Sequence, residues 1–134
     1  MKQVKKQKGD ILQQVHAFES LVRQCDQVEC PVRERLVGGQ YLRECTMPAG
    51  IMVVSKMHKC EHPFFVTKGK VSVFTEGKGW ELIEAPFTGI TQPGTKRILY
   101  THEDTIWTTV HRTDKETIEE VINEIIVNDK NIEQ

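Results

Sequence analysis

This sequence of 134 residues has no long apolar run and no surplus of charge of either sign. No segment approaches the ~20 consecutive apolar residues of a membrane-spanning helix, and the N-terminus lacks the apolar centre of a secretion signal. The formal net charge of −1 gives the molecule no overall attraction for nucleic acid or for a membrane surface. These absences predict a cytoplasmic protein whose partners include neither a membrane nor a polymeric nucleic acid.

Cysteine is scarce, and its spacing matches no common zinc or redox motif. The four cysteines are Cys25, Cys30, Cys45 and Cys60, without a CxxC pair among them. In a reducing cytoplasm we expect four free thiols. The nucleophile elbow Gly-x-Ser-x-Gly and the phosphate-binding Walker loop are also absent. The sequence therefore leans toward ligand binding rather than catalysis but leaves enzyme activity open.

Two helices are predicted, one near each end of the chain. Apolar residues recur at steps of four and three over residues 11–25, after Asp10 as a cap. At the other end, Thr113 and Glu116 form a capping box before a second apolar stripe over residues 118–126. Each stripe suits packing on a sheet or pairing with a second copy of the chain. We expect a homodimer.

Between the two helices the apolar period changes from 3.6 to 2. Many short strands separated by Gly and Pro are typical of a sandwich or barrel. We divide the chain into an N-terminal tail and helix (1–39), a barrel (40–112) and a C-terminal helix (113–134), within one globular domain. The expected strands cover residues 41–46, 51–56, 62–67, 70–74, 80–83, 87–91, 96–100 and 105–111.

The segment from Lys56 to Gly69 is the richest in side chains that can bind a ligand. It reads KMHKCEHPFFVTKG and places His58, Cys60 and His62 within five residues. It then enters an apolar strand and ends at a Lys-Gly turn. Because polar side chains placed against a sheet usually point into a cavity, we expect this segment to form one wall of a binding site.

The order of these motifs resembles the cupin superfamily of small jelly-roll β-barrels. A typical first cupin motif reads His-x-His, three or four residues, Glu, six residues, Gly. Aligned on Gly69, the Glu position falls on His62, the second His on His58 and the first on Lys56. In the second motif, Arg97 stands in the histidine position. The resemblance covers about residues 40–111 and implies a mainly β, cupin-like jelly-roll barrel flanked by the two helices.

The residues at these motif positions differ in charge from the cupin pattern. An ordinary cupin binds a divalent metal there, whereas Lys56 and Arg97 are cationic and the usual carboxylate is missing. Two fixed cations repel a divalent ion. We therefore predict non-catalytic binding of a small anionic ligand, phosphate-bearing or nucleotide-like, without a cofactor. The candidate ligand-binding residues are Lys56, His58, His62, Thr95, Lys96, Arg97, Tyr100, Trp107 and His111.

A metal-dependent cupin enzyme is the first alternative. Trp107 and His111 stand at even spacing on the last expected strand and therefore share a face. If that face points inward, His58, His62 and His111 can bind a divalent metal as a three-histidine site.

The segment from Ala85 to His111 also resembles a group of small cupin-like proteins of bacteriophages. The residues that carry this resemblance are Ala85-Pro86, Pro93 to Arg97, Tyr100, Glu103-Asp104, Trp107 and His111. It implies capture of a host signalling nucleotide in the host cytoplasm or, as a second alternative, a structural phage protein with an empty barrel.

Overall fold

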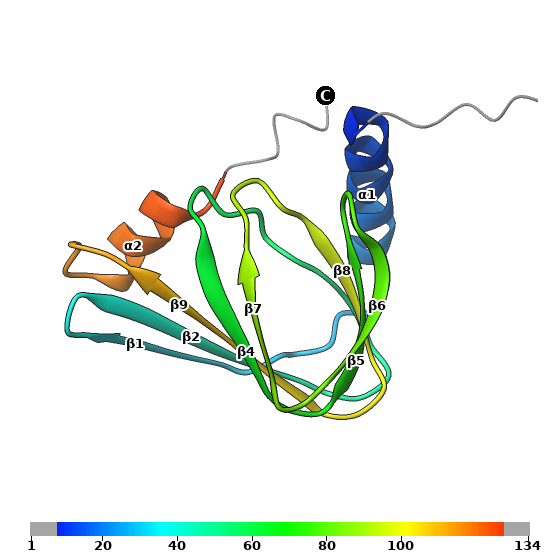
Figure 1. Cartoon of the computed structure of the whole chain (residues 1–134). Helices are drawn as coiled ribbons and strands as arrows, with labels where there is room; N and C mark the ends of the chain where they lie inside the picture. The colour runs from blue at the N-terminus through cyan, green and yellow to red at the C-terminus, as the bar shows by residue number, and fades with distance from the viewer. Residues whose placement is uncertain (1–7, 128–134) are drawn as a thin grey trace, which may run out of the picture.

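The computed structural model describes residues 8–127, which form nine strands between two helices (Figure 1). The helices are α1 (Lys8–Arg23) and α2 (Ile118–Ile125). The strands are β1 (Val32–Val37), β2 (Gln40–Met47), β3 (Met52–Val54), β4 (His62–Lys68), β5 (Lys70–Thr75), β6 (Gly79–Glu84), β7 (Phe87–Thr91), β8 (Arg97–Thr101) and β9 (Thr105–Arg112).

The strands form two antiparallel sheets that face each other. The five-stranded sheet has the order β1-β2-β9-β4-β7, and the four-stranded sheet has the order β3-β8-β5-β6. Alternate side chains of both sheets point inward and form one apolar core. The buried members of this core are Met47, Phe64, Val66, Val71, Val73, Ile83 and Leu99.

The strand β1 lies in a segment for which the sequence analysis predicted only a tail and a helix. It pairs with β2, and Val37 lies opposite Gln40 across a two-residue connection. That connection is Gly38-Gly39, with φ angles of 58° and 78°. Two successive positive φ angles are typical of a tight hairpin turn, which is why glycine is preferred at both positions. The sheet therefore begins at residue 32 rather than 40.

The helix α1 packs on the outer face of the four-stranded sheet (Figure 1). Val15 is buried in this interface, and a cavity of about 260 Å³ remains between the helix and the sheet. The helix starts before Asp10, so that residue lies within the helix and the predicted cap was wrong. Within the described residues, no helix is long and apolar enough to cross a membrane.

The N-cap of helix α2 lies four residues after the cap predicted from the sequence. Its N-cap is Thr117, whose hydroxyl accepts a hydrogen bond from the Glu120 amide at 3.2 Å and donates one to the Glu120 carboxylate at 2.9 Å. The prediction of Thr113 as the cap was wrong, because the Thr113 hydroxyl instead accepts from the Lys115 amide in a local turn. The apolar face of α2 packs on Tyr41.

Candidate functional site

Three histidines from separate parts of the sequence meet inside the barrel. His58 precedes β4, His62 begins β4, and His111 lies near the end of β9, the neighbour of β4 in the sheet. One ring nitrogen of each lies within 4.8 Å of the others. The ring centroids are 4.2 Å apart for His62 and His111, 4.5 Å for His58 and His62, and 5.1 Å for His58 and His111.

Strand alternation explains why two of these side chains point inward. On β4, His62 shares a face with the core residues Phe64 and Val66. On β9, His111 shares a face with Trp107, as their even spacing predicts, and Trp107 packs against the core. His62 and His111 are both buried, and His58 is half-buried.

Hydrogen bonds orient two of the three rings. The His62 Nδ1 lies 3.0 Å from the Cys60 carbonyl, which can only accept, so Nδ1 carries the proton in this bond and Nε2 is left for a ligand. The His111 Nε2 lies 2.9 Å from the Thr109 hydroxyl, so Nδ1 of this ring is left for a ligand. Histidines that bind metals commonly use their second ring nitrogen in this way, because the bond holds the ring in one orientation.

Burial keeps all three imidazoles neutral. It lowers the pKa of His58 to about 4 and that of His111 to about 3, and the neighbouring imidazoles and Arg43 add to both effects. Burial also lowers the pKa of His62, and the charge of Arg97 acts in the same direction. Neutral imidazole is the form that binds a metal ion, so at pH 7 the three ligand atoms need not lose protons first.

Arg97 lies in the same interior and is the half-buried fixed cation of the site, whereas Arg43 acts on the histidines from an exposed position. Its Nη1 donates to the Thr91 hydroxyl at 2.8 Å and its Nε to the Thr75 hydroxyl at 3.3 Å. Its guanidinium carbon lies 5.0 Å from the ring centroid of Phe64, which stacks on Trp107 with centroids 4.4 Å apart. Burial lowers the pKa of Arg97, but an arginine side chain keeps its proton in proteins.

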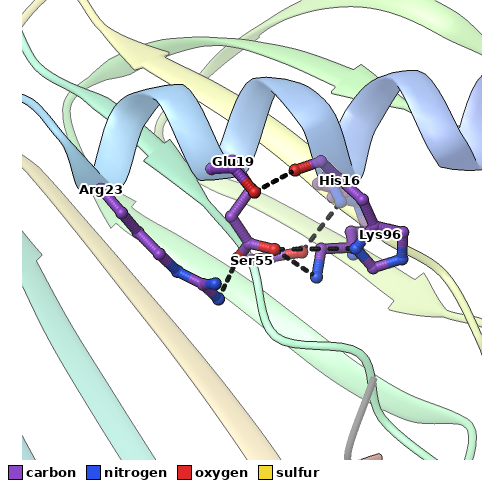
Figure 2. A network of polar contacts seen from close by, with 7 residues as sticks. His16, Glu19, Arg23, Ser55 and Lys96 are labelled. Carbon is purple, nitrogen blue, oxygen red and sulfur yellow. Dashed lines mark hydrogen bonds and ion pairs between the residues drawn. The ribbon is translucent and has the colours of Figure 1, made fainter. Parts of the chain in front are cut away.

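Four other residues considered in the sequence analysis point elsewhere. Lys56 and Cys60 are exposed. Lys96 is buried on the other side of β8, where its Nζ lies 2.9 Å from the Glu19 carboxylate of α1 (Figure 2). Tyr100 is exposed and contacts the ring of His102. The structure thus brings His58, His62, Arg97 and His111 together, with Trp107 behind Phe64.

The predicted site residue Thr95 lies in the turn before β8, and two further threonines hold Arg97. Thr95 is half-buried in that turn, where its amide donates to the Gln92 carbonyl at 3.3 Å. Thr75 and Thr91 were not predicted as site residues, because isolated threonines carry no recognisable signal in a sequence. Only the strand register places them at the site, because it pairs Thr91 with His62 and Thr75 with Arg97.

The C-terminal helix closes the barrel end that contains the histidines. Ile126, directly after α2, forms an isolated β-bridge with His58. The Lys59 amide donates to the Ile125 carbonyl at 2.8 Å, and the Val127 amide donates to the Met57 carbonyl at 2.9 Å. The segment that carries His58 is therefore held directly by the end of α2.

Known structures that resemble this one share the cupin fold. They include ectoine synthase from P. lautus (17% identity, 75% of each chain, TM-score 0.58) and the DMSP lyase DddQ from Ruegeria pomeroyi (16% identity, 70% of this chain and 55% of that one, TM-score 0.55). A third is an RmlC-like cupin family protein from Methanocaldococcus jannaschii (11% identity, 66% of this chain and 84% of that one, TM-score 0.53).

These similarities confirm the predicted cupin-like jelly-roll barrel with a helix toward each end of the chain. At these identities they show the fold alone. No protein-family model matches the sequence, and no curated protein matches it either.

Proposed function

We propose that this protein binds a divalent transition metal ion through His58, His62 and His111, and that a small ligand binds beside the ion inside the barrel. The observation that carries the proposal is the convergence of three ring nitrogens within 4.8 Å of one another in a largely buried site. Isolated buried histidines are common in protein cores, but three that converge and have low pKa values are typical of functional sites.

The residues present fit such an ion by their chemistry. Three neutral imidazoles are a common donor set for zinc, copper, iron and nickel. The hydrogen bonds of His62 and His111 hold each ring with one nitrogen free to bind. A metal held by three protein ligands acts as a Lewis acid toward a ligand in its open position.

The charge balance around the histidines is also more favourable than the sequence indicated. The expectation of a metal-free site assumed that both Lys56 and Arg97 face the metal position. The side chain of Lys56 is exposed, and the neighbouring cation Lys96 is paired with Glu19 on the opposite face of β8. Arg97 remains as a half-buried cation, and the exposed Arg43 also acts on His58 and His111. Because solvent and salt screen an exposed charge, the repulsion of a divalent ion is smaller than two buried cations would produce.

A second candidate function is the binding of a small anion without a metal. Arg97 supports it, because the part of the chain that the structure describes places no carboxylate within ion-pair distance of this guanidinium. A nucleotide-like ligand, and with it the capture of a host signalling nucleotide by a phage protein, belongs to this candidate. Enzyme activity stays open under both candidates, since the fold is shared by enzymes such as ectoine synthase.

The test is a titration of the chelator-treated protein with Co²⁺, followed by its visible absorption and by calorimetry. We expect one equivalent to bind to the native protein. The variant His62→Ala should bind Co²⁺ at least about 100-fold more weakly, since even the loss of a second-shell partner costs about 10–100-fold.

The matched control is His102→Ala, which removes an exposed imidazole that lies 2.7 Å from the Ser72 hydroxyl and contacts the ring of Tyr100. It should bind Co²⁺ like the native protein. Equal affinity in all three proteins would contradict the proposal. Absence of Co²⁺ binding, together with stabilisation by AMP that requires Arg97, would favour the second candidate instead.

A further inference from the structure

Arg97 has hydrogen-bond donors that the described part of the protein does not use. A guanidinium carries five N–H groups in one plane. Two of them are used, by Thr75 and Thr91, and no hydrogen bond joins Nη2 to any other residue between positions 8 and 127. The charge of Glu81 favours the protonated form of Arg97, but among the described residues no carboxylate lies within ion-pair distance of the guanidinium. A half-buried cation without a direct counter-charge is unfavourable by itself. An anionic ligand would supply both the charge and the acceptors.

The position of Arg97 relative to the histidines follows from the strand register. Thr91 on β7 pairs directly with His62 on β4. The Cβ atoms of such pairs lie about 5 Å apart. Because the Arg97 Nη1 lies 2.8 Å from the Thr91 hydroxyl, the guanidinium is a near neighbour of the His62 imidazole. The charge of Arg97 accordingly lowers the pKa of both His58 and His62.

The guanidinium is held in place before any ligand arrives. Thr75 and Thr91 are both buried, at 5% and 3% exposure, and each hydroxyl accepts from a different nitrogen of Arg97. Phe64 lies against the guanidinium face and is itself stacked on Trp107, with only 5° between the ring planes. Such preorganisation lowers the entropic cost of ligand binding.

We infer that Arg97 is the specificity-determining residue of the site, and that the ligand is a small carboxylate held by Arg97 on one side and by the metal on the other. This inference rests on the metal site proposed above. The planar fork of a guanidinium matches the two oxygens of a carboxylate. The single positive charge of one guanidinium also balances the single negative charge of a carboxylate.

The same surroundings argue against a larger or more highly charged ligand. A phosphate monoester carries up to two negative charges and needs further donors. Lys56 is exposed and Lys96 is paired with Glu19, and Arg43, whose charge acts on His58 and His111, is exposed as well. Tyr100, a candidate for stacking on a base, is exposed outside the barrel. The histidine rings lie 4.2–5.1 Å apart and the end of α2 closes over His58. These contacts favour a ligand of few atoms.

The experiment titrates the Co²⁺-loaded protein with acetate, inorganic phosphate and AMP, and follows the visible absorption of the bound ion. Acetate should change the spectrum of the native protein at lower concentration than phosphate or AMP. Arg97→Gln should need about 10–100-fold more acetate, which is the range for losing hydrogen bonds to a charged group. Arg97→Lys should fall between the two, because it keeps the charge and loses the fork.

The matched control is Arg112→Gln, which removes an exposed arginine at the end of β9. It should respond to acetate like the native protein. The inference is overturned if Arg97→Gln responds like the native protein, or if phosphate or AMP acts at lower concentration than acetate.

A second readout separates this inference from the metal site itself. The thermal unfolding of the chelator-treated protein is measured with and without acetate. If Co²⁺ does not bind, the proposed function fails; acetate stabilisation that Arg97→Gln abolishes would still support the role of Arg97. Equal stabilisation of both proteins would overturn that role whether or not a metal binds.

Discussion

Two buried polar clusters lie on opposite sides of the chain where β8 begins: Lys96, directly before the strand, belongs to one, and Arg97, its first residue, belongs to the other. Lys96 lies under α1, where its Nζ is 2.9 Å from Glu19, and Glu19 also contacts Arg23 at 3.5 Å and His16 at 3.8 Å (Figure 2). Arg97 points into the barrel, where two hydroxyls and an aromatic ring surround it and the nearby imidazoles are neutral.

The difference concerns how each cluster balances its charge. In the cluster under α1, cations and a carboxylate of the same chain compensate each other. In the barrel cluster, the described residues supply a cation and three neutral metal-type ligands but no carboxylate at ion-pair distance. We conclude that the first cluster fixes α1 to the sheet, whereas the second is suited to bind a metal ion and an anionic ligand.

The largest effect is expected from Lys96→Met, which leaves the buried Glu19 carboxylate without its nearest cation. Breaking a buried ion pair from one side costs about 3 kcal/mol or more, so urea unfolding should show a loss of that size. Lys70→Met is the control, because the Lys70–Glu84 pair is exposed and such pairs contribute less than about 1 kcal/mol. A loss no greater than the control would show that the cluster under α1 does not hold the helix.

The barrel cluster should instead make stability depend on pH. Unfolded histidines take up protons near pH 6.5, whereas burial and neighbouring charges lower the pKa of His58 to about 4 and that of His111 to about 3. The unfolded state then binds more protons, so the metal-free protein loses stability as the pH falls from about 6.5. The loss of stability should level off only when the pH falls below the pKa values of these histidines in the folded state.

Urea unfolding of the metal-free protein at several pH values measures this loss. In His111→Gln it should be smaller by about 1–2 kcal/mol between pH 7 and 5. His102→Gln, which removes an exposed histidine, is the control. An identical pH dependence in all three proteins would mean that the imidazoles are not shielded from protons.

A moderate effect is expected from Thr117→Ala, which loosens the helix that covers the barrel cluster. Loss of an N-cap costs about 1 kcal/mol. Hydrogen exchange of the Lys59 amide, which donates to Ile125, should accelerate, while amides of α1 keep their protection. Thr113→Ala, at the cap expected from the sequence, is the comparison; if it exposes the Lys59 amide equally, the assignment of Thr117 fails.

The smallest effect on folding is expected from Arg97→Met. Because the described residues place no carboxylate at ion-pair distance from this cation, its replacement by an apolar side chain leaves no buried counter-ion. The desolvation that Arg97 no longer undergoes offsets the two hydrogen bonds lost to Thr75 and Thr91, so the stability should change by less than about 1 kcal/mol in urea unfolding. This small change contrasts with the loss of about 3 kcal/mol expected from Lys96→Met at the neighbouring residue. A loss of about 3 kcal/mol would show that Arg97 serves the fold in the way that Lys96 does.

Local signals were sufficient for most of the barrel. The predicted strand over residues 87–91 matches β7, and seven other strands overlap their predicted ranges, because alternating burial repeats every two residues. β1 was missed because three successive charged residues, Arg33 to Arg35, obscure its alternation. Thr113 and Thr117 each stand three residues before a Glu, and the packing of α2 on Tyr41 distinguishes them.

From the sequence one could learn that His62 begins a strand, that Trp107 and His111 share a face, and that Arg97 stands where a metal-binding histidine is usual in cupins. The first two statements depend on the order and parity of residues, which are local, and the third depends on the resemblance to the cupin motifs. Only the tertiary structure decided that β9 lies beside β4, which joins His111 to His62 and His58.

The tertiary structure also decided that Lys96 faces Glu19 while Arg97 faces the histidines. Strand parity puts neighbouring residues on opposite faces, but which face is the interior depends on the packing of the two sheets and of α1, and therefore on contacts between residues far apart in the chain.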